Sequence, residues 1–96
     1  MDIGMAIKIL RMKAGLTQEQ LGERIGMSIN SVSSLETGKT YPPTPTVKRL
    51  CEAFGIPRSY LMLASIDEGD FPEDKRVLYR ALLEPLRKEL LDEKNS

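Results

Sequence analysis

The amino-acid sequence predicts an all-α protein, in which one compact domain is followed by a further helical segment. No stretch of its 96 residues alternates apolar and polar side chains with the period of two that strands show. No Asn-Gly or Asp-Gly turn joins two β-branched runs, so a hairpin is not indicated either. Residues that cap or end helices instead recur along the chain, with apolar residues at helical spacing between them.

The first two predicted helices are short and closely spaced. Residues 3–13 carry apolar side chains at i, i+4 and i+3 spacing, and Gly15 is placed to end this helix. Residues 18–25 form the second helix, which opens with a capping box between Thr17 and Gln20.

Three more helices complete the predicted domain. The third begins at Ser28 and ends near Glu36, and residues 38–45 form a loop because their prolines hold the backbone extended. The fourth helix has Thr44 as its cap and Pro45 at its first position, and it runs through Phe54. A short fifth helix covers residues 58–64.

The connection between the second and third helices points to a specific motif. Only Gly26-Met27-Ser28 joins them, which is too tight for antiparallel stacking, so the two helices must cross at a steep angle. Gly22 is small where they come closest, and Val32 and Leu35 anchor the third helix. The outward residues at the start of the third helix are then free to contact another molecule.

Composition excludes several classes of protein. Hydrophobic residues make up 41% and charged residues 29%, with no apolar run of the roughly 20 residues needed to cross a membrane. The N-terminus does not resemble a secretory signal. Cys51 is the single cysteine, which excludes an internal disulfide and suits the cytoplasm, and histidine is absent. We expect a cytoplasmic protein that is not an enzyme and needs no metal and no cofactor.

The net charge of zero is the sum of two unlike parts. Residues 1–65 hold eight basic and five acidic side chains, a net charge of +3, whereas residues 66–96 hold six basic and nine acidic ones, a net charge of −3. A mildly basic domain followed by an acidic segment is compatible with DNA binding by the first part alone.

The segment LTQEQLGERIGMSINSVSSLETGKTYPPTPTVKRLCEAFGIPRSYLM resembles the lambda-repressor/Cro-like helix-turn-helix domain of bacterial and phage regulators, the XRE family. The likeness covers about residues 5–64. It implies a five-helix domain over residues 1–65 whose third helix lies in the DNA major groove with its first residues at base edges. Gly22 departs from the family's usual alanine. We expect that change to cost about 0.5–1 kcal/mol of helix stability without altering the close fit.

The resemblance also implies roles for individual residues. The implied base-reading residues are Ile29, Asn30, Ser33 and Ser34. The implied phosphate-contacting residues are Gln18, Ser28, Ser31, Thr37 and Lys39, although Ser28 is foremost a helix cap. Asn30 is the favoured base reader, since its amide suits adenine N6 and N7. Arg11 and Glu36 match an ion pair that joins the first helix to the end of the third.

After the domain, a hinge is predicted over residues 65–72, and the part over residues 66–96 continues from it as a long amphipathic helix. A capping box of Asp70 with Glu73 would open this helix, which would reach about Asp92 with a kink or break near Pro85. Its apolar stripe contains Leu78, Leu82, Leu86 and Leu90. The stripe suits dimerisation, but it would also be covered by folding back onto the chain's own domain or by docking a different protein.

Together these features indicate a DNA-binding transcriptional regulator, most simply a repressor, that binds double-stranded DNA as a homodimer. Its two half-sites would lie about one helical turn apart. One alternative is an antitoxin-type protein whose C-terminal helix binds a partner protein. Another is a helix-turn-helix scaffold that makes protein contacts only.

Overall fold

The computed structural model describes residues 1–91, which contain helices and turns but no strand, so the all-α prediction is confirmed. The first part holds α1 (Ile3–Lys13), α2 (Gln18–Ile25), α3 (Ile29–Glu36), α4 (Thr44–Phe54) and α5 (Arg58–Ser65). Two single 3-10 turns follow, at Glu68–Asp70 and Glu73–Lys75. The last helical segment consists of α6 (Arg76–Leu78), a π-helical turn (Tyr79–Leu83) and α7 (Glu84–Leu90).

Side-chain caps open α1, α2 and α3, whereas the start of α4 differs from the prediction. The Asp2 side chain accepts a hydrogen bond from the Met5 amide at the start of α1. Helix α4 already begins at Thr44, so Pro43 occupies the cap position and supplies no side-chain hydrogen bond. The expectation that Thr44 is the cap was therefore wrong by one residue, because prolines on both sides of it preset a helical start.

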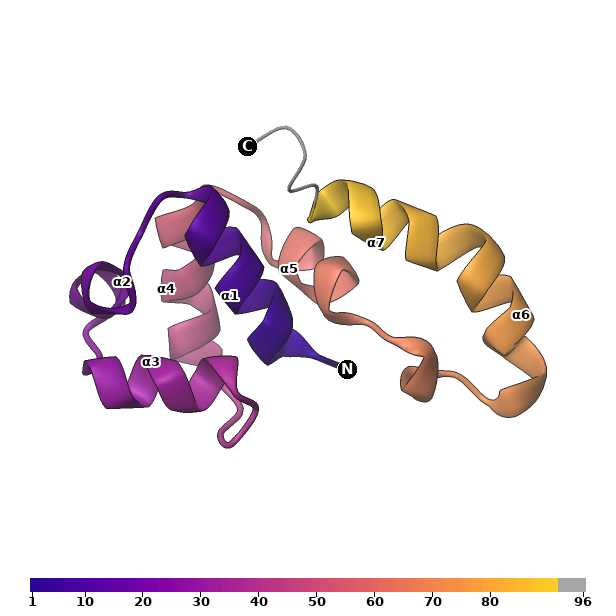
Figure 1. Cartoon of the computed structure of the whole chain (residues 1–96), viewed down its shortest axis with the longest axis horizontal. Coiled ribbons are helices and arrows are strands. Elements are labelled where there is room, and N and C mark those ends of the chain that lie inside the picture. Colours follow the sequence, from indigo (N-terminus) through magenta and orange to yellow (C-terminus); the bar gives the residue numbers. More distant parts are fainter. Residues whose placement is uncertain (92–96) are drawn as a thin grey trace.

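The helices of the first part enclose one hydrophobic core, with α1 in contact with α3, α4 and α5 (Figure 1). Its most deeply buried large side chains include Ile7, Leu21, Ile25, Val32, Leu35, Leu50 and Leu61. Cys51 lies in the same cluster, and burial raises the pKa of its thiol. The cysteine therefore contributes as a small apolar side chain.

The predicted capping box between Asp70 and Glu73 is not what the structure has. Asp70 instead turns back to accept a hydrogen bond from the Asp67 amide at 2.9 Å. It also lies 2.7 Å from the ammonium group of Met1, which lowers the pKa of the Asp70 carboxyl and raises that of the ammonium. The ion pair between Asp70 and Met1, which are far apart in sequence, thus replaces the predicted local capping box between Asp70 and Glu73.

The helical backbone continues through Pro85. Tyr79–Leu83 form a π-helical turn in which the Glu84 amide donates to the Tyr79 carbonyl, and Pro85 follows in the first turn of α7. Because proline has no N–H, it removes one backbone hydrogen bond from a continuous helix, and the π-helical turn lies just before it.

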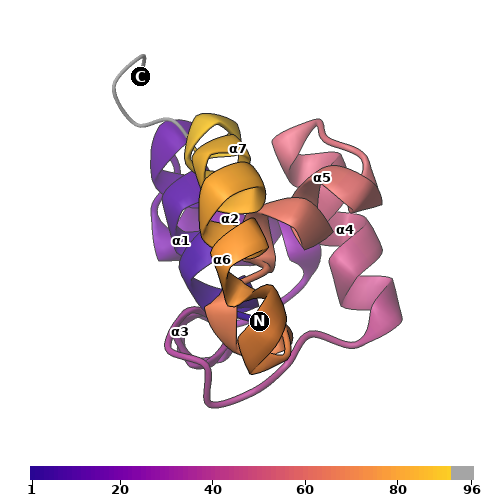
Figure 2. The same ribbon diagram turned by 90° about the vertical axis from the view of Figure 1, so that its right-hand side faces the viewer.

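Helix α7 packs on α5 at its C-terminal end. The Tyr60 hydroxyl donates a hydrogen bond to the Leu90 carbonyl, and Leu91 is buried with the core residues. Leu78, Leu82 and Leu86 remain exposed, by 54%, 66% and 45%. Figure 2 shows the ribbon of α6 and α7 in front of the rest of the molecule. One end of the segment thus folds back onto the domain, while its outer apolar face stays uncovered.

No helix within residues 1–91 combines the length and apolar character that crossing a membrane requires.

Candidate nucleic-acid interface

The turn between α2 and α3 fixes the two helices at a steep angle. Thr17 and Gln20 form the predicted capping box, with hydrogen bonds of 3.1 and 2.8 Å. Gly26 ends α2 in the left-handed conformation, at φ 72°, which favours glycine. The Ser28 hydroxyl then caps α3 by accepting from the Ser31 amide at 3.1 Å. Figure 1 shows the result, with α3 along the lower left edge of the molecule and α2 above it.

The turn is tighter than the sequence indicated. A Cβ atom on Gly22 would lie 2.3 Å from the Met27 carbonyl oxygen, so the backbone of the turn would have to shift to accommodate it. The Met27 amide also donates to the Gly22 carbonyl at 2.8 Å, which fixes this approach. The expectation that alanine would keep the same close fit was therefore wrong, and glycine is required for this α2–α3 spacing.

Helix α3 presents a polar face with one apolar residue at its start. Val32 and Leu35 are buried, as predicted, which turns the opposite face outward. Ile29 is 47% exposed and Asn30 is exposed, whereas Ser33 and Ser34 are half-buried. Within residues 1–91 no hydrogen bond uses the Asn30 amide group, so both its donor and its acceptor are available to a ligand.

A groove runs along α3 that sequence reasoning did not identify. The loop after α3 forms one wall, with Thr40 and the exposed Tyr41, and α3 supplies Asn30, Ser31 and Ser34. The groove has a volume of about 340 Å³. Tyr41 falls within the loop predicted for residues 38–45, but nothing in the sequence pattern placed it beside α3.

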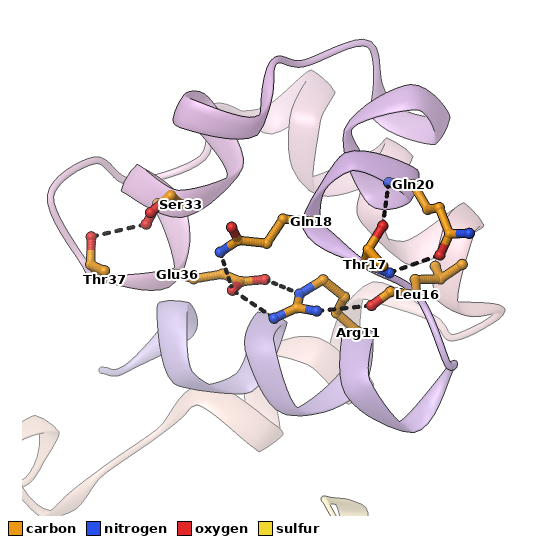
Figure 3. Close-up of polar contacts among 8 residues, drawn as sticks. All are labelled: Arg11, Leu16, Thr17, Gln18, Gln20, Ser33, Glu36 and Thr37. Carbon is orange, nitrogen blue, oxygen red and sulfur yellow. Dashed lines mark hydrogen bonds and ion pairs between the residues drawn. The ribbon is translucent and has the colours of Figure 1, made fainter.

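A buried polar network connects three elements behind this face (Figure 3). The Arg11 guanidinium donates from Nε to Glu36 Oε2 at 2.6 Å and from a terminal nitrogen to Glu36 Oε1 at 3.2 Å. Its other terminal nitrogen donates to the Leu16 carbonyl at 2.8 Å. The side chains are only 12% and 2% exposed, so full pairing offsets the cost of burying both charges.

Gln18 joins this network, which was not foreseen. Its Nε2 donates to Glu36 Oε1 at 3.1 Å, so the carboxylate of α3 holds the amide at the start of α2. The two residues lie 18 positions apart, and no periodicity relates them. One amide hydrogen and the amide oxygen of Gln18 remain for another partner.

The remaining phosphate-contact candidates differ in what they have left to donate. The Ser28 hydroxyl donates to the Ser31 hydroxyl at 3.0 Å, which leaves the Ser31 proton available. The Thr37 hydroxyl donates to the Ser33 carbonyl at 2.9 Å and is thereby occupied (Figure 3). Lys39 is exposed beside the end of α3. Ser31 and Lys39 are consequently better placed to donate than Thr37.

Comparison with known proteins decides the family. A family model described as helix-turn-helix matches residues 7–61, more than half of the chain. The chain belongs to the lambda-repressor-like (XRE) helix-turn-helix family. The resemblance noted in the sequence is thereby confirmed.

The chain is similar to several bacterial regulators. It is 29% identical over 93 residues to the HTH-type transcriptional regulator ImmR of Bacillus subtilis (strain 168), covering 97% of this chain and 71% of that protein. It is 32% identical over 77 residues to the competence pilus inhibition repressor of Acinetobacter baylyi, covering 77% and 70%. It is 36% identical over 69 residues to the HTH-type transcriptional regulator y4dJ of Sinorhizobium fredii, covering 72% and 88%.

These findings establish the general activity of the XRE-family chain. The family consists of DNA-binding transcription regulators, which are generally not enzymes. Across the described 91 residues, no group of three or more Cys, Asp or Glu side chains is placed to hold a metal ion.

Proposed function

We propose that this protein is a sequence-specific repressor that binds double-stranded DNA as a homodimer, with α3 in the major groove. The observation that carries the proposal is the outward face of α3, where Ile29 and the unbonded Asn30 side chain stand at the start of the helix. In helix-turn-helix domains this part of the second helix of the motif contacts base edges.

Each base-reading candidate has a distinct chemistry. The Asn30 amide would pair with adenine N6 and N7, and Ile29 would pack on a thymine methyl group. Ser33 and Ser34 both donate and accept, so they would discriminate less between bases. Their half-buried positions suit short contacts with the groove edge.

Phosphate contacts would come from the two ends of the motif. Gln18 lies at the N-terminal end of α2, where backbone amides favour an anion, and Glu36 orients its amide. Ser28, Ser31, Thr37 and Lys39 would hold the backbone along α3. Sequence-independent contacts of this kind supply much of the affinity and make it fall as salt rises.

The exposed leucines support the homodimer. Leu78, Leu82 and Leu86 form an apolar face on residues 66–91, outside the DNA-binding part over residues 1–65. Pairing two copies would cover this face and let one assembly read two half-sites. Relatives named as repressors support negative regulation, by occupation of an operator in the cytoplasm. Such binding needs no cofactor.

The same uncovered leucines support a second candidate, an antitoxin-type protein. In that case the leucine face would bind a different protein while α3 still binds DNA. A purified chain that is monomeric at every concentration would favour this second candidate.

Selection of bound sequences from a randomised duplex pool, at near-physiological salt, tests the proposal. An enriched inverted repeat is expected, with affinity that falls steeply with salt. If the pool shows no enrichment and affinity does not respond to salt, DNA reading through α3 is excluded and the motif serves protein contacts instead.

A further inference from the structure

We propose that two copies of this chain pair their C-terminal helical segments in antiparallel orientation, centred on Leu82. This inference rests on the proposed homodimer and specifies how its interface is built. The segment runs from the 3-10 turn at Glu73–Lys75 through α7, and Figure 2 shows it lying across the outside of the molecule.

The segment has one covered face and one uncovered face. Tyr79 and Leu91 are 3% and 5% exposed, because Tyr79 packs against Phe71 and Leu91 joins the core of the domain, so this side is already covered by the chain itself. Val77 and the three leucines, Leu78, Leu82 and Leu86, face solvent. A contiguous apolar face of this kind marks an interaction site.

An apolar pocket lies at one end of this face. Its lining includes Phe71, Tyr79 and Leu83, and the ring centroids of Phe71 and Tyr79 are 5.1 Å apart. Leu78 and Leu82 border it toward solvent, and its volume is about 320 Å³. The pocket has room for an aliphatic side chain that comes from outside.

Two-fold symmetry shows which side chain that is. In a two-fold contact, if residue i meets residue j, then j meets i. Leu78 and Leu86 stand four positions before and after Leu82, so antiparallel pairing centred on Leu82 places Leu86 of the second copy beside Leu78 and its pocket. In a parallel pair each pocket would face the same pocket of the second copy, so neither pocket would receive a side chain.

Charge complementarity supports the same orientation. Lys75 and Glu89 stand seven positions before and after Leu82, and both are exposed. In the described part of the chain neither forms an ion pair. Antiparallel pairing brings Lys75 of each copy opposite Glu89 of the other, so the dimer contains this ion pair twice. Parallel pairing would oppose like charges, which disfavours it.

Charge reversal tests this register through the dimer dissociation constant, measured by sedimentation equilibrium on the full chain. Lys75→Glu and Glu89→Lys should each weaken the dimer roughly tenfold, because each turns two attractive pairs into repulsive ones. The double variant should return to within about threefold of the wild-type constant, since it restores both pairs with reversed sign. Lys48→Glu on α4 is the matched control and should change nothing.

Cysteine cross-linking gives an independent readout, in a Cys51→Ala background. Leu82→Cys lies at the proposed two-fold axis and should form an intermolecular disulfide on oxidation. Leu78→Cys alone should not, whereas a mixture of Leu78→Cys and Leu86→Cys chains should cross-link. Self-cross-linking by all three single variants would show parallel pairing and overturn the inference.

The outcomes distinguish failure of the antiparallel register from failure of the proposed homodimer. If neither charge reversal changes the dimer dissociation constant, or if the double variant dimerises more weakly than the single variants, the antiparallel register is wrong but the homodimer stands. A wild-type chain that stays monomeric at every concentration would overturn the homodimer itself, and the register with it.

Discussion

At the scale of single residues, Asn30 carries most of the proposed sequence discrimination. We expect Asn30→Ala to weaken binding to the selected site by about 1–3 kcal/mol while leaving random DNA nearly unchanged. The reason is that a bidentate amide contact is made only to the correct base. Paired titrations of both duplexes measure this, with Ser59→Ala on α5 as a control that should alter neither. Equal losses on the two duplexes would remove Asn30 from the base readers.

Gln18 is expected to act through Glu36. Gln18→Ala should weaken binding to every duplex by about 1.5 kcal/mol, roughly tenfold in Kd, because it removes a hydrogen bond to a charged phosphate. In an Arg11→Met, Glu36→Met background the charged network is replaced by apolar side chains and the Gln18 amide loses its acceptor. There the same substitution should cost much less.

A double-mutant cycle over these four proteins measures the coupling, with circular dichroism to verify that each is folded. If Gln18→Ala costs the same in both backgrounds, Glu36 does not position the amide and serves stability alone.

At the scale of elements, the α2–α3 turn should not tolerate a side chain at position 22. Gly22→Ala gains helix propensity but places a Cβ 2.3 Å from the Met27 carbonyl oxygen. The cost of this overpacking should exceed the gain in helix propensity, so the free energy of unfolding should fall by about 1–2 kcal/mol. Urea denaturation measures the change, and Ser59→Ala, at an exposed helix position, should be neutral or slightly stabilising. Unchanged stability in Gly22→Ala would mean that the turn widens freely.

The helices were predictable where their signals are local. The Thr17–Gln20 capping box and the Ser28 cap each involve residues three apart, and both formed as expected. The contacts that the sequence did not reveal join distant positions. Asp70 pairs with Met1 rather than capping the next helix, and Gln18 bonds to Glu36 across 18 residues.

The same distinction applies to the candidate site. The exposure of Ile29 and Asn30 was predictable, because a short helix with Val32 and Leu35 buried has only one outward face. Their base-reading roles, which the family resemblance implies, stay predictions. The place of Tyr41 beside α3 was not predictable, because it depends on the path of a loop that no periodicity specifies.

At the scale of the whole molecule, charge and shape are arranged along one long axis. The molecule extends 41 Å, with α3 near one end and the segment from α6 to α7 at the other (Figure 1). Glu84 and Glu89 of α7 therefore lie away from the proposed DNA-binding face, which keeps them from repelling phosphates.

This arrangement predicts the spacing of the operator half-sites. Two copies joined through their leucine faces hold their α3 helices at opposite ends of the dimer, and both must face the same side of the duplex. The half-site centres should then be a whole number of turns apart, at about 34 Å per turn. Because each molecule is 41 Å long, we expect two turns, about 21 base pairs, rather than the single turn suggested by the sequence.

Sequence selection with the wild-type chain and with a Leu82→Asp, Leu86→Asp variant measures this spacing. Both leucines are exposed, so the variant should fold, and it should enrich single half-sites with weaker binding. The wild type should enrich inverted repeats of fixed spacing, since only the paired form reads both halves together. If the variant selects the same inverted repeat at the same spacing, a surface other than the leucine face joins the two copies on DNA.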